Sequence, residues 1–82
     1  MTALILVVDD IPANVKLLEA KLSAEYYDVI TACDGVEALE QVKKHKPDLV
    51  LLDVMMPGMD GIEVCQRIKA MPKWEALPIV MV

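Results

Sequence analysis

The chain has 82 residues, 56% of them hydrophobic, and its 13 acidic and 8 basic residues give a formal net charge of -5. This length accommodates one small domain with a single core, and the composition excludes a disordered chain. The acidic balance disfavours nucleic acid and anionic membrane surfaces as partners.

The first half of the chain alternates between strand and helix signals. Residues 4–8 form an aliphatic run typical of a buried strand, and Pro12 is suited to the first turn of a helix that we expect to end near residue 25. A second strand is predicted over residues 27–32. Asp34 is then placed to cap a second helix. Its expected apolar face consists of Val36, Leu39 and Val42.

The second half continues the alternation. Residues 49–52 are apolar at successive positions, which predicts a strand covered on both faces. After Pro57 and Gly58, Asp60 is expected to cap a third helix. The expected apolar face of this helix consists of Ile62, Cys65 and Ile68. Residues 79–82 are predicted to form a fourth strand. Alternation of this kind predicts one α/β domain over residues 1–82, with right-handed crossovers and a parallel sheet.

The N-terminal run and the cysteines do not indicate a membrane-bound or a secreted protein. The apolar run near the N-terminus is far shorter than the roughly 20 residues of a membrane span, and it has no basic flank. Cys33 and Cys65 lie within apolar patterns without metal-ligand spacing, which predicts reduced thiols in the core. We therefore expect a cytoplasmic protein without a membrane partner.

Three carboxylates follow the first and third predicted strands. Parallel strands present their carboxyl ends at one edge of a sheet, so Asp9, Asp10 and Asp53 are expected to converge. Ionised carboxylates at such distances repel one another unless a proton or a cation is shared. Mg²⁺ prefers oxygen ligands and often completes its shell with a phosphoryl oxygen, which indicates phosphate chemistry with Asp53 as nucleophile.

Structural roles remain open for the same residues. Asp53 is also placed to cap the turn after its strand. Asp9 and Asp10 are also placed to cap the helix that begins near Pro12. A phosphatase of the haloacid dehalogenase type is disfavoured because its Asp-x-Asp motif is replaced here by two adjacent aspartates.

The motifs VVDD at residues 7–10 and LLDVMMPGMDG at residues 51–61 resemble the receiver domain of two-component response regulators. The resemblance implies a flavodoxin-like fold with sheet order 2-1-3-4-5, and phosphoryl transfer from a sensor histidine kinase or phosphotransfer protein to Asp53. It also implies that the chain is an autocatalytic acceptor and not an enzyme, and that Mg²⁺ is required. The implied metal ligands are Asp9, Asp10, Asp53 and the backbone carbonyl of Met55. A diguanylate cyclase output domain is implied only by similarity to one regulator within this family.

The chain departs from this family at its C-terminal end. A family receiver places a Thr or Ser after its fourth strand and a Lys on its fifth, whereas this sequence ends at Val82 and its last lysine, Lys73, precedes the fourth strand. We expect an incomplete receiver that lacks the fourth helix, fifth strand and fifth helix. Without the lysine, stabilisation of the transferring phosphoryl group should weaken.

The apolar residues 79–82 predict self-association. An exposed aliphatic edge strand and an uncovered sheet face favour a homodimer formed through that edge and face. The alternative to a phosphoacceptor is therefore a non-switching receiver that acts as a dimerising interaction module without productive phosphorylation.

Overall fold

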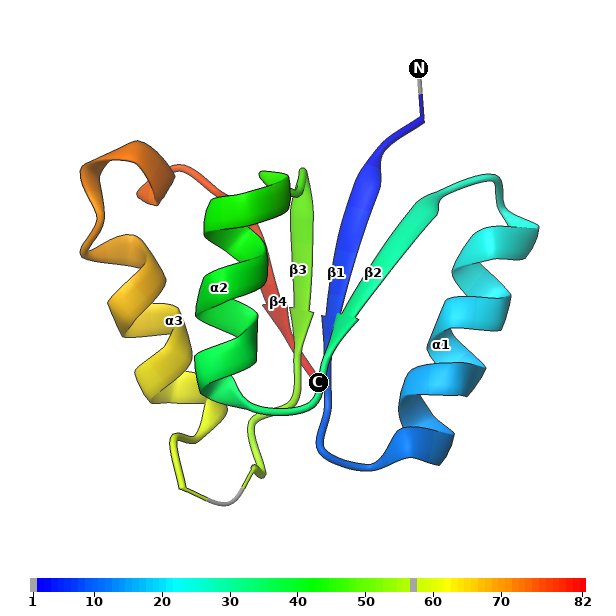
Figure 1. The fold of residues 1–82 in the computed structure, drawn as a ribbon, viewed down its shortest axis with the longest axis horizontal. Helices are drawn as coiled ribbons and strands as arrows, with labels where there is room; N and C mark the ends of the chain where they lie inside the picture. Colours follow the sequence, from blue (N-terminus) through cyan, green and yellow to red (C-terminus); the bar gives the residue numbers. More distant parts are fainter. Residues whose placement is uncertain (1, 57) are drawn as a thin grey trace.

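The computed structural model describes residues 2–56 and 58–82, so Pro57 of the predicted turn lies outside the described residues. Strands and helices alternate along these residues as predicted (Figure 1). The elements are β1 (Leu4–Val8), α1 (Pro12–Ala24), β2 (Asp28–Ala32), α2 (Gly35–His45), β3 (Leu49–Leu52), α3 (Gly61–Lys69) and β4 (Ile79–Met81), with a short 3-10 helix at Pro72–Trp74.

The four strands form one parallel sheet in the order β2-β1-β3-β4. This order confirms the predicted flavodoxin-like arrangement over the strands that the chain contains. From β1 the chain first adds β2 on one side, and the later strands β3 and β4 lie on the other side, so the order of connection switches between β1 and β3. At this switch point Val8 of β1 pairs with Leu52 of β3. The carboxyl ends of these two central strands therefore lie next to each other, which is where ligands bind in open α/β sheets.

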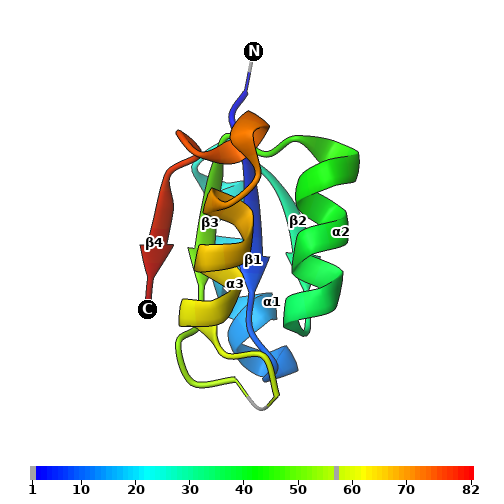
Figure 2. The ribbon, with the colours of Figure 1, turned by 90° about the vertical axis from the view of Figure 1, so that its left-hand side faces the viewer.

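The two faces of the sheet are covered unequally. The helices α2 and α3 lie side by side on one face, and α1 lies on the other (Figures 1 and 2). The buried cluster between the sheet and α2 with α3 includes Leu6, Leu52, Val42, Val64 and Ile68. By contrast, no residue of α1 is buried. The larger buried cluster therefore lies on the side of α2 and α3, while Ile5 and Val7 of β1 are buried on the other side of the sheet.

Two helices begin at the predicted caps. The side chain of Asp34 accepts a hydrogen bond from the Glu37 backbone N–H at 2.7 Å, and that of Asp60 accepts one from the Glu63 N–H at 2.9 Å. Both bonds satisfy a donor that the first turn of a helix leaves without an internal partner. The capping role predicted for Asp60 is confirmed, which separates it from the three aspartates at the sheet edge.

The predicted apolar faces of α2 and α3 were partly wrong. Val36 is 58% exposed and Ile62 is 50% exposed, whereas Ala38 and Val64 are fully buried. Side chains on a helix recur every 3.6 residues, so the sequence indicates several possible faces, and contact with the sheet decides between them.

The prediction that Cys33 is a core thiol was also wrong. It is exposed, one residue beyond the end of β2, while Cys65 is half-buried. A hydrogen bond with the Glu37 carboxylate, and the charge of that group, raise the pKa of the Cys33 thiol above its ordinary value. The thiol is therefore held protonated at neutral pH, which lowers its reactivity as a nucleophile.

No helix among residues 2–56 and 58–82 has the length and apolar character to cross a bilayer.

Candidate functional site

Backbone hydrogen bonds between the central strands bring the predicted site together. The Asp53 N–H donates to the Val8 carbonyl at 2.9 Å, and the Asp9 N–H donates to the Ala32 carbonyl at 3.2 Å. Each aspartate is thereby fixed as the first residue beyond its strand. Since β1 and β3 are neighbours in the sheet, Asp9 and Asp53 lie next to each other although they are far apart in the chain.

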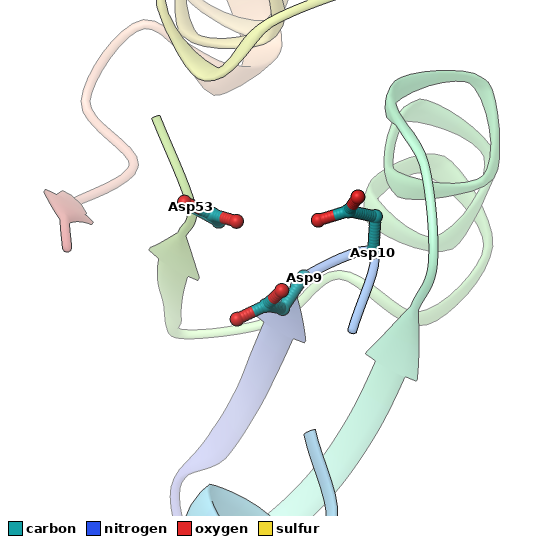
Figure 3. Close-up of side chains that lie close together, drawn as sticks. All are labelled: Asp9, Asp10 and Asp53. Atoms are coloured by element: carbon teal, nitrogen blue, oxygen red, sulfur yellow. The ribbon is translucent and has the colours of Figure 1, made fainter. Parts of the chain in front are cut away.

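The carboxylates of Asp9, Asp10 and Asp53 form one cluster, as the sequence predicts. Each offers an oxygen, and these oxygens all lie within 4.8 Å of one another. Figure 3 shows the side chains of Asp10 and Asp53 directed toward each other, with Asp9 beside them at the end of β1. Asp9 is only 8% exposed, and the other two are half-buried. The cluster therefore combines concentrated negative charge with restricted access of water.

Local hydrogen bonds orient two of these carboxylates. One oxygen of Asp9, Oδ1, accepts the Ile11 N–H at 2.9 Å, and Oδ1 of Asp53 accepts the Met55 N–H at 3.0 Å. The Asp53 bond confirms the predicted turn-capping role. Ile11 occupies the N-cap position of α1 without a side-chain cap, so the alternative in which Asp9 or Asp10 caps that helix was wrong. Among the described residues, Oδ2 of Asp9 and of Asp53 accepts no hydrogen bond and is available to a ligand.

The chemistry of the cluster fits a hard divalent cation. Two unit charges separated by the 4.8 Å limit of the cluster repel by about 3 kcal/mol at an effective dielectric near 20, so three ionised carboxylates are unfavourable without compensation. A Mg²⁺ ion uses one or two carboxylates, waters and phosphate oxygens. Asp9, Asp10 and Asp53 supply oxygen donors of the type and proximity that such an ion uses.

A hollow of about 400 Å³ opens beside the cluster. Asp9, Asp53 and Met55 line it on the side of the sheet edge. The rest of its lining comes from Ile11, Asn14, Leu17, Leu18 and Val82. The side chain of Met55 is 84% exposed, and its backbone carbonyl remains a predicted metal ligand. The hollow therefore places an apolar surface, contributed by α1 and by Val82 just beyond β4, beside the Asp53 carboxylate.

The sequence analysis assigned no site role to the residues of α1 that line this hollow. Leu17 lies outside the set Val15, Leu18 and Leu22, which recur at helical spacing and are half-buried. The one available signal was that α1 has apolar residues beyond that set.

Gly61 supports the site from the start of α3, and this role was also missed. A Cβ atom at this position would lie 2.5 Å from the Asp53 carbonyl oxygen and 2.8 Å from Cα of Val54. Its N–H also donates to the Val54 carbonyl at 3.3 Å. The absence of a side chain at residue 61 lets α3 begin directly against the backbone of Asp53. This packing fixes the position of the Asp53 backbone, from which the carboxylate extends.

Comparison with known proteins identifies relatives of the whole chain. The profile of the family described as "Response regulator receiver domain" matches residues 5–82. The response regulator PleD of Caulobacter vibrioides is 58% identical over 82 residues, which are all of this chain and 18% of PleD. The alkaline phosphatase synthesis transcriptional regulatory protein PhoP of Bacillus subtilis is 54% identical over 69 residues, or 84% of this chain and 29% of PhoP. The chain thus spans less than a third of either relative.

Solved structures agree in fold. The N-terminal domain of a response regulator receiver protein from Methanoculleus marisnigri is 44% identical and superposes with a TM-score of 0.95, over 99% of this chain and 66% of that one. The chemotaxis protein CheY4 of Vibrio cholerae is 33% identical, with a TM-score of 0.95, over 99% of this chain and 68% of that one. The arrangement of strands and helices is therefore shared with these proteins across almost all of the chain.

Proposed function

Because the chain belongs to the response regulator receiver domain family of two-component signalling, we propose that it accepts a phosphoryl group on Asp53 from a histidine kinase or phosphotransfer protein. The observation that supports this most is the convergence of three carboxylates, from the ends of two strands, within 4.8 Å. A purely structural aspartate at a strand end needs no such neighbours, which repel it. Mg²⁺ is the proposed cofactor, and the cytoplasm is the proposed location.

The hydrogen bond that Asp53 accepts assigns the attacking oxygen. Asp53 keeps Oδ1 on the Met55 N–H, so Oδ2 is the oxygen that attacks phosphorus. A P–O bond to Asp53 forms as the bond from phosphorus to the donor breaks, and the donor leaves with the electron pair. Asp9 and Asp10, with Asp53 and the Met55 carbonyl, would hold Mg²⁺. When bound, this ion neutralises charge on the transferring oxygens. The chain modifies itself, so it is an acceptor and not an enzyme.

The test is direct phosphorylation of the 82-residue chain. Incubation with Mg²⁺ and acetyl phosphate should give a covalent adduct by intact mass spectrometry, and peptide mapping should locate it in the segment that contains Asp53. Beryllofluoride, which mimics a phosphoryl group on an aspartate, should bind at the same residue. An excess of EDTA is the control and should prevent both reactions. A folded chain that forms no adduct in Mg²⁺ would contradict the proposal.

A second prediction separates the electrostatic role of Asp10 from any structural one. Replacing Asp10 by asparagine removes one charge from the cluster, so the variant should be more stable than the unmodified chain in EDTA. Each kcal/mol of repulsion relieved corresponds to about 4–8 °C in Tm for a domain of this size. The increase in Tm on adding Mg²⁺ should be smaller in the variant than in the unmodified chain. Thermal unfolding followed by circular dichroism, with and without Mg²⁺, measures both effects. An equal Mg²⁺-dependent increase in both proteins would contradict the proposed ligand role.

The alternative function is a non-switching interaction module that dimerises and binds a kinase without accepting phosphate. Self-association without any adduct at Asp53, in the phosphorylation experiment above, would select this alternative.

A further inference from the structure

The end of β2 lies beside the aspartate cluster and next to β1 (Figure 1). The Ala32 carbonyl faces β1, because it accepts the Asp9 N–H at 3.2 Å. Hydrogen-bonding groups of successive residues point to opposite sides of a strand, so those of Thr31 and Cys33 face away from β1. Groups on the outer side of an edge strand receive no partner from the sheet. The backbone on both sides of Ala32 therefore depends on other elements for its hydrogen bonds.

Two side chains of α2 bond to these outward-facing groups. Nε2 of Gln41 donates to the Thr31 carbonyl at 3.1 Å. Oε1 of Glu37 accepts the Cys33 N–H at 2.7 Å. Gln41 follows Glu37 by one helical turn, so both lie on one face of α2, and both are half-buried there. The helix therefore bonds to the residue before Ala32 and to the residue after it.

We infer that Gln41 and Glu37 are positioning residues for Asp9, which they hold in the metal site by fixing the end of β2. Strand ends with exposed backbone hydrogen bonds open locally at a low cost in free energy. Opening here would release the Ala32 carbonyl from the Asp9 N–H. Because the Asp9 side chain is only 8% exposed and its Oδ1 accepts the Ile11 N–H, it has little room to compensate for a shift of its backbone. The inference rests on the proposed function, in which Asp9 holds Mg²⁺.

The first test is the affinity of the chain for Mg²⁺. Gln41→Met keeps the length of the side chain and a high helix propensity but removes the donor. Isothermal titration calorimetry should show a Kd for Mg²⁺ about fivefold higher than that of the unmodified chain. The matched control is Gln66→Met, the same change at an exposed position of α3, which should leave the Kd unchanged. A lower Tm in Gln41→Met with an unchanged Kd would show a purely structural role and overturn the inference.

A pair of variants isolates the hydrogen bond of Glu37 from its charge. Glu37→Gln and Glu37→Met both remove the charge, but only glutamine keeps an oxygen that can accept the Cys33 N–H. Glu37→Met should therefore bind Mg²⁺ about fivefold more weakly than Glu37→Gln. Equal affinities in the two variants would overturn the positioning role of Glu37.

Amide hydrogen exchange separates this inference from the proposed function, because it needs no metal. In EDTA, the Asp9 N–H should exchange about fivefold faster in Gln41→Met than in the unmodified chain or in Gln66→Met, as measured by NMR. An unchanged exchange rate would overturn the inference even if Mg²⁺ binds at the cluster. If the unmodified chain bound no Mg²⁺, the proposed function would fail, and the exchange rate would still decide whether Gln41 holds Asp9. Circular dichroism of each variant checks that it is folded.

Discussion

Replacing Asp53 by asparagine is expected to reduce phosphorylation by acetyl phosphate to background while leaving the chain folded. The asparagine amide keeps an oxygen that can accept the Met55 N–H, so the turn after β3 is preserved. It has no carboxylate to attack phosphorus, and it removes one of the three charges that would hold Mg²⁺. Loss of that charge should also raise Tm in EDTA, which distinguishes a chemical defect from an unfolded protein.

The matched control for this variant is Asp60→Asn. Asp60 lies in the same loop as Asp53, between β3 and α3, and it caps α3 through the Glu63 N–H. Asparagine is an equally good capping residue. This variant should be phosphorylated at the rate of the unmodified chain. Intact mass spectrometry over a time course compares the three proteins. Adduct formation in the Asp53 variant at more than background would show that another residue is the acceptor.

Replacing Gly61 by alanine is expected to destabilise the domain by about 3 kcal/mol, at the upper end of the range for overpacked cores. The new Cβ would lie 2.5 Å from the Asp53 carbonyl oxygen, and its nearest neighbours are all backbone atoms, so no flexible side chain can move away. Alanine has the higher helix propensity, but this gain is at most about 1 kcal/mol and does not offset the contact. Because the contact displaces Asp53 itself, phosphorylation should slow as well.

The glycine at position 58 provides the comparison. It has a φ of +74°, and an added Cβ atom would meet no other atom within 4 Å, so Gly58→Ala should cost only the backbone strain of about 1–2 kcal/mol. Urea unfolding gives the free energies, and acetyl phosphate labelling gives the rates. If Gly61→Ala were no less stable than Gly58→Ala, the close packing of α3 on the Asp53 backbone would not be the reason for glycine at residue 61.

Much of the site could be predicted because its determinants are local. Asp9 and Asp53 each follow a continuous aliphatic run, and the alternation of strands with helices is sufficient to predict a parallel sheet whose carboxyl ends share an edge. The helix caps could also be predicted from the sequence, because Asp34 and Asp60 each directly precede a helix. Each side chain accepts a hydrogen bond from the backbone N–H three residues later. The family motifs then restricted the chemistry of the three carboxylates.

The faces of the helices could not be predicted in the same way. Val36 and Ile62 fit a helical repeat as well as Ala38 and Val64 do, and only the packing of α2 and α3 on the sheet selects the second pair for burial. The exposure of Cys33 depends on the residue at which β2 ends. The contact of Gly61 with Asp53 depends on the path of the loop between them.

The sequence by itself determined the order of the elements, the strand ends that carry acidic residues and the caps of two helices. Each of these follows from residues that are neighbours in the chain or from a strict repeat. Tertiary structure alone decided which carboxylate oxygens remain available and which glycine supports Asp53. These features depend on distances between segments that the chain connects only through its fold, so no local pattern contains them.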